Sequence, residues 1–76
     1  LPIEIKNLTN LKILDLDSNK ISIIPIEIGN LVNLTKLHLS NNKIKILPIE
    51  IVSIKKLKNL ILYDNDFIFP PKNIIE

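Results

Sequence analysis

Four polar residues combine types that can do nucleophilic or acid–base chemistry. His38, the single histidine, stands two residues before Ser40, and Asp15 and Asp17 stand 23 residues before His38 and Ser40. An aspartate that orients a histidine, which in turn activates a serine hydroxyl, is the composition of a nucleophilic triad. Asp15, His38 and Ser40 are therefore the first residues to test for catalysis.

The spacing of these residues argues against a catalytic site. His38 and Ser40 lie in a segment of alternating apolar and polar residues, which predicts a strand whose residues i and i+2 point the same way. Parallel side chains do not converge on one reacting atom, and no tight turn holds Ser40 at an exposed elbow beside backbone amides. We expect no catalytic residue and no enzymatic activity in this chain.

The carboxylates give little sign of a metal site. Asp15 and Asp17 share one face of a predicted strand, and Asp64 and Asp66 stand at a turn. Calcium and magnesium need a set of spaced oxygen ligands, and the absence of Cys excludes thiolate ligands. We expect neither a bound metal nor a cofactor.

The spacing of 23 residues is the period of the whole chain. The segment LKILDLDSN at residues 11–19 returns as LTKLHLSNN at 34–42 and as LKNLILYDN at 57–65. Proline recurs on the same period at Pro2, Pro25, Pro48 and Pro71. Self-similarity of this kind indicates a solenoid, in which each repeat stacks on its neighbours.

The pattern L-x-x-L-x-L-x-x-N-x-(I/L/F), with the phrase L-P-x-E-I-x-x-L-x-x-L, resembles the leucine-rich repeat family. The match is to its short 23-residue class, which is found in Ras-linked and bacterial intracellular proteins, and it covers essentially the whole chain. The resemblance implies an α/β fold: a right-handed solenoid, or horseshoe, with a parallel β-sheet on the concave face and short helical or 3-10 turns on the convex face. It also implies that Asn19, Asn42 and Asn65 are buried and bond to turn backbone.

We interpret residues 1–76 as a single domain, with repeats starting near residues 1, 24, 47 and 70. The chain opens within a repeat and lacks an initiator Met, so we expect a piece of a longer array that is monomeric within its longer chain. The double proline at residues 70–71 resembles the lead-in to a terminal capping segment.

Three short parallel strands are predicted, around residues 13–17, 36–40 and 59–63. Their inward positions are leucines, namely Leu14, Leu16, Leu37, Leu39, Leu60 and Leu62. On the convex return, the residues expected to face the core are Ile5, Leu8, Ile28, Leu31, Ile51, Ile54 and Ile74.

The outward strand positions form the candidate binding surface. Core positions keep Leu in every repeat, whereas one outward row reads Asp15, His38, Ile61, so the scaffold is constant and the surface varies. We expect Asp15 to stabilise the charged form of His38, and Tyr63 to be the best anchor. The candidate partner contacts are Ile13, Asp15, Asp17, Lys36, His38, Ser40, Asn59, Ile61 and Tyr63.

The leading interpretation is a protein–protein interaction module that binds a partner protein on its concave sheet. One alternative is the recognition or regulatory arm of a larger signalling enzyme (GTPase, kinase, phosphatase or ubiquitin ligase) whose catalytic domain lies outside the chain. The other is a purely structural solenoid segment. No small-molecule substrate is expected, because an extended curved surface offers no pocket.

The amino-acid composition limits the classes of partner and the cellular compartments to be expected. The net charge of +2 comes from ten Lys without any Arg, and nucleic-acid readers usually rely on Arg, so no nucleic-acid partner is expected. No apolar run reaches the roughly 18 residues of a membrane span, so no membrane partner is expected. The absence of Cys fits a reducing compartment, and with the resemblance to intracellular repeats it favours the cytoplasm.

Two rows of apolar residues depart from the family pattern, in which both positions are usually polar. One row is Ile3, Ile26 and Ile49, and the other is Ile23, Ile46 and Phe69. A compositional bias toward Ile, Lys and Asn explains these rows, and so does a docking surface; the sequence leaves both open. The basic cluster Lys55, Lys56 and Lys58 is interpreted as a solvated face.

Overall fold

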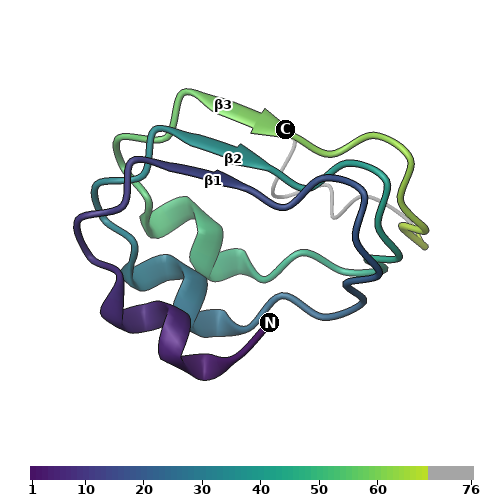
Figure 1. The fold of residues 1–76 in the computed structure, drawn as a ribbon, viewed down its shortest axis with the longest axis horizontal. Helices are drawn as coiled ribbons and strands as arrows, with labels where there is room; N and C mark the ends of the chain where they lie inside the picture. Colours follow the sequence, from purple (N-terminus) through teal and green to yellow (C-terminus); the bar gives the residue numbers. More distant parts are fainter. Residues whose placement is uncertain (69–76) are drawn as a thin grey trace.

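The computed structural model describes residues 1–68, in which short 3-10 turns alternate with short strands. Their order is η1 (Ile3–Asn7), β1 (Ile13–Asp15), η2 (Ile26–Asn30), β2 (Lys36–His38), η3 (Ile49–Ser53) and β3 (Asn59–Ile61). Figure 1 shows the strands along one side of the coil and the 3-10 turns along the other. Buried residues of both layers, such as Ile28 of η2 and Leu37 of β2, form the core. The predicted α/β stack of repeats, with a parallel sheet on one side and 3-10 turns on the other, is confirmed.

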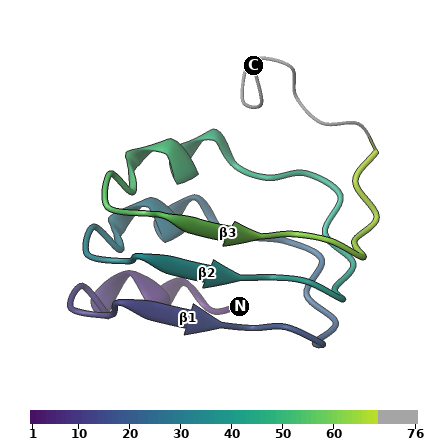
Figure 2. The same cartoon turned by 90° about the horizontal axis from the view of Figure 1, so that it is seen from above.

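The three strands form one parallel sheet in the order β1-β2-β3, and Figure 2 shows them side by side in the same direction. The register pairs residues that are 23 apart: Leu14 with Leu37, and Leu37 with Leu60. Each residue is thus adjacent to its counterpart in the next repeat. The rows predicted from the period are therefore real rows in space.

Each strand spans three residues instead of the five predicted. The chain turns three residues after the last residue of each strand, at Ser18, Asn41 and Asp64, whose φ angles are 60°, 57° and 60°. Left-handed backbone of this kind ends an extended strand. Pairing between repeats still continues past β1 and β2, because Ser18 N donates to Ser40 O over 2.9 Å.

A proline precedes each 3-10 turn, as the sequence predicts. Pro2, Pro25 and Pro48 have φ angles of −75°, −70° and −69°, which are already suited to the start of a helical turn. Each turn then buries one isoleucine: Ile5, Ile28 and Ile51. Within residues 1–68, no helical segment is long and apolar enough to cross a membrane.

Burial is most complete in the middle of the stack. Six residues are fully buried at 0% exposure: Ile28, Leu31, Leu34, Leu37, Leu39 and Ile44. Leu14 and Leu60, the counterparts of Leu37 on the two outer strands, are only partly buried. Leu8 contradicts the prediction of a core position, since it is 49% exposed at the end of η1, where no preceding turn among the described residues covers it. Ile74, also expected in the core, lies outside the described residues.

Asparagine side chains join the turns that follow the strands. Asn42 Nδ2 donates to the carbonyl oxygens of Leu16 and Leu39, both over 3.0 Å, and Asn42 Oδ1 accepts a hydrogen bond from Ile21 N. Asn65 repeats this arrangement one turn later. Asn42 is 6% exposed, whereas Asn19 is exposed and bonds only within its own turn, so burial of the predicted row is confirmed for Asn42 alone.

Gly29 is required where η2 passes close to η3. A Cβ atom at this position would lie 2.8 Å from the carbonyl oxygen of Glu50. Real Cβ atoms essentially never come so close to another atom. The single glycine of the chain thus permits two neighbouring turns to stack closely on the convex face.

Candidate functional site: the concave sheet face

Eight of the nine predicted contact residues lie at least partly exposed on or beside the sheet. One row holds Ile13, Lys36 and Asn59, and the next holds Asp15, His38 and Ile61. Asp17 and Tyr63 follow the ends of β1 and β3, and Tyr63 is 70% exposed. The structure therefore brings together the two rows that the period predicts, but it does not test whether they bind a partner.

Ser40 does not belong to this exposed surface. It is 1% exposed, so its hydroxyl cannot contact a partner on the concave face. The reason lies in its backbone: Ser40 N donates to Asp17 Oδ1 over 2.7 Å, and Ser40 O accepts hydrogen bonds from Ser18 N and from the Asn42 side chain. These bonds hold Ser40 inside the junction of two repeats, which corrects the prediction of an outward position.

Asp17 faces His38 in place of Asp15. Asp17 Oδ2 lies 3.6 Å from His38 Nδ1, and both side chains are about one third exposed. Asp15 instead turns along its own strand, where its Oδ1 accepts a hydrogen bond from Asp17 N over 3.1 Å. The alternation of inward and outward residues along the strand predicts that both aspartates lie on one face. The local hydrogen bonds of Asp15 and Asp17 determine which of the two side chains reaches the imidazole.

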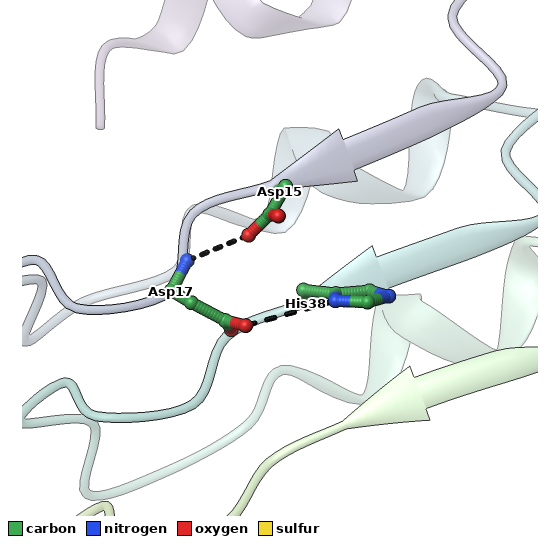
Figure 3. Close-up of side chains that lie close together, drawn as sticks. All are labelled: Asp15, Asp17 and His38. Atoms are coloured by element: carbon green, nitrogen blue, oxygen red, sulfur yellow. Dashed lines mark hydrogen bonds and ion pairs between the residues drawn. The ribbon is translucent and has the colours of Figure 1, made fainter.

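Figure 3 shows the resulting cluster of Asp15, Asp17 and His38, in which Asp17 contacts each of the other two. The nearest potential ligand atoms of the three side chains all lie within 4.8 Å of one another. An exposed ion pair of this type contributes at most about 1 kcal/mol to stability, because water screens it. The contact between Asp17 and His38 therefore contributes little to the free energy of folding.

The geometry does not give His38 a serine nucleophile. Ser40 Oγ is buried and has no hydrogen-bond partner among residues 1–68, so no bond links it to the imidazole. A histidine must be within hydrogen-bond reach of a hydroxyl to remove its proton. Asp15, His38 and Ser40 are thus near each other in the fold without being arranged as a triad.

The bond between Asp17 and Ser40 is the feature that sequence reasoning missed. A short acidic side chain just before a turn readily accepts a hydrogen bond from a backbone amide. Asp17 stands directly before Ser18, whose positive φ starts the turn. An aspartate at this repeat position could therefore have been interpreted as a cap for the adjacent strand's backbone rather than as a surface charge alone.

Both apolar rows outside the sheet are exposed where the structure describes them. Ile23 and Ile46 are 75% and 66% exposed, and together with Ser22, Ile24, Lys45 and Pro48 they line a shallow groove between repeats. The other row, on the 3-10 turns, is 51–59% exposed, at Ile3, Ile26 and Ile49. Phe69 lies outside the described residues.

A comparison with protein families now agrees with the geometry. A family model described as a leucine-rich repeat region matches residues 3–75, which is nearly the whole sequence. No curated protein compared with this chain is similar enough to count as a match.

Proposed function

The chain belongs to the leucine-rich repeat family, and on that premise we propose that it binds a partner protein on the concave face of its sheet. Repeats of this family are typically non-catalytic interaction modules. The proposed contacts are the eight residues that are at least partly exposed, Ile13, Asp15, Asp17, Lys36, His38, Asn59, Ile61 and Tyr63.

The contrast between constant and variable positions carries this proposal. Leu14, Leu37 and Leu60 hold the same inward position in three consecutive strands, while the outward row beside them changes from acidic to imidazole to aliphatic. A solenoid needs the inward residues for its own stacking. The outward residues are free of that requirement, which supports a role in recognition.

Tyr63 is the proposed energetic centre of the contact. It is 70% exposed, and its backbone is fixed because Tyr63 O accepts a hydrogen bond from Asn41 N over 3.0 Å. Exposed tyrosines on rigid backbone often dominate binding energy, since a large ring is buried with little loss of conformational entropy. Half-buried Ile61 in β3 would extend the apolar part of the same contact.

We expect Tyr63→Ala to weaken partner binding about thirtyfold or more, because loss of a central aromatic residue costs about 2 kcal/mol or more. The full-length protein would be used to recover partners from its source cells, and each recovered protein would then be titrated against wild type and variant. Val52→Ala is the matched control, since Val52 is 54% exposed on η3, away from the sheet.

Unchanged affinity of the Tyr63→Ala variant, with loss of binding in an Ile23→Ser, Ile46→Ser variant, would move the site to the groove between repeats. That groove is the second candidate because its two isoleucines are the most exposed of the two apolar rows. A cytoplasmic location belongs to the same proposal, and it is supported by the resemblance to intracellular repeats and the lack of Cys.

A further inference from the structure

The cluster of Asp15, Asp17 and His38 offers a mixed set of nitrogen and oxygen donors from β1, the segment just after it, and the adjacent β2. One atom from each side chain lies within 4.8 Å of the other two. Figure 3 shows the His38 ring directed toward the Asp17 carboxylate, with the Asp15 carboxylate turned toward the backbone nitrogen of Asp17. Neither β1 nor β2 alone could supply this set.

The separation of His38 Nδ1 and Asp17 Oδ2 suits one shared metal ion. At 3.6 Å the contact is too long for a hydrogen bond. Two ligands of a tetrahedral zinc ion, each about 2.1 Å from the metal, lie about 3.4 Å apart. A shift of a few tenths of an ångström would bring this pair to that separation, and the Asp15 oxygen, which lies within 4.8 Å of the other two atoms, would have to move closer to complete the set.

Backbone amides hold both carboxylates while leaving oxygen atoms free. Asp17 Oδ1 accepts a hydrogen bond from Ser40 N over 2.7 Å, and Asp17 Oδ2 is the oxygen turned toward the imidazole. Asp15 Oδ1 likewise accepts from Asp17 N over 3.1 Å. Metal ligands are commonly oriented by such outer hydrogen bonds, because these fix the carboxylate without occupying its second oxygen.

Ser40, the residue bonded to Asp17, carries a buried hydroxyl. Ser40 is 1% exposed, and its Oγ has no hydrogen-bond partner among the described residues. Its own amide donates to the Asp17 carboxylate, so Ser40 is anchored to a member of the cluster. A buried hydroxyl without a partner calls for an explanation, and a nearby ion site is one.

Contrary to the expectation from the sequence, we propose that Asp15, Asp17 and His38 bind one divalent transition-metal ion, and that zinc is the best-matched ion. Imidazole nitrogen suits zinc and its neighbours, whereas calcium and magnesium prefer oxygen ligands alone and in larger number. Three protein ligands would leave a fourth position open, as in zinc sites that bind water or an outside ligand. The site does not depend on the proposed partner and can be tested without one.

Zinc titrated into the metal-stripped chain would test this proposal directly, because His38 is the single histidine and its ring signals report on the ion. We expect saturable one-to-one binding by calorimetry, with a change at the His38 ring nitrogens in NMR spectra. Asp17→Asn keeps the oxygen that accepts the Ser40 hydrogen bond, and His38→Phe keeps a ring without nitrogens. Each variant should bind zinc at least about tenfold more weakly.

Asp66→Asn is the matched control, since it removes one negative charge from an exposed residue outside the cluster. It should leave zinc affinity within about twofold of wild type. Equal weakening by Asp66→Asn and Asp17→Asn would overturn the proposal in favour of diffuse attraction. So would saturation that leaves the His38 ring signals unchanged, or the absence of saturable binding at millimolar zinc in chain shown to be folded by circular dichroism.

Discussion

Asp17 is the side chain that ties the first repeat to the second at the end of their strands. Its Oδ1 accepts the hydrogen bond of Ser40 N, and Ser40 is almost fully buried. A buried amide that loses its only partner costs far more than the bond contributes in water, since it also loses hydration. The structural weight of Asp17 therefore comes from this bond rather than from its ion pair with His38.

We predict that Asp17→Ala lowers the free energy of unfolding by about 1–3 kcal/mol, the penalty for an unpaired buried amide. Asp17→Asn should cost less than about half of that, because its amide oxygen can still accept from Ser40 N. Urea denaturation followed by circular dichroism measures both. Asp15→Ala is the control, since its hydrogen bond to Asp17 N is exposed. Equal losses for Ala and Asn at residue 17 would mean that charge, not the hydrogen bond, is what matters.

At the scale of elements, the turns after the strands are joined by asparagine. Asn42 satisfies carbonyl groups of its own turn and of the preceding one, and it accepts from Ile21 N over 3.1 Å. Buried turns need such partners, because their backbone groups have no water to bond. Asn19 makes only the bonds within its own turn and is exposed.

The Asn42→Ala variant should lose about 2–4 kcal/mol of stability, since several buried backbone groups are left unpaired at once. The Asn19→Ala variant should lose less than about 1 kcal/mol, because water can replace the side chain there. Denaturant midpoints at a common slope give both values. Similar losses at residues 19 and 42 would show that the row contributes only through each residue's own turn.

The elements were predictable because the period of 23 residues also defines neighbours in space. A shift by one repeat carries each residue onto its counterpart, so the row of Asp15, His38 and Ile61 followed from the sequence. The directions of the side chains within these rows could not be predicted from the period. The alternation of residues predicts that Asp15 and Asp17 share a face. It does not predict that Asp17 Oδ1 accepts from Ser40 N, just before the turn at Ser18, while Asp17 Oδ2 faces His38. The exposure of Leu8 also depends on what covers the first turn, which the period does not specify.

At the scale of the whole molecule, each repeat packs only against the repeats beside it. The middle repeat has neighbours on both sides and holds the fully buried residues, such as Leu37 at 0% exposure. Its counterparts Leu14 and Leu60 are partly exposed on the outer strands. In a linear stack of this kind, stability is roughly the sum of repeat and interface terms, so it should be highest in the middle.

We therefore predict a graded response to one substitution made in two repeats. Leu37→Ala should cost about 3 kcal/mol or more, through lost burial and a cavity bounded on both sides. Leu14→Ala should cost about half as much, because part of that side chain is already in water and the site opens to solvent. Thermal and urea unfolding of the 76-residue chain measure the difference. If the two variants lost equal stability, the interfaces between repeats would not carry the gradient, and the core would respond as one undivided unit.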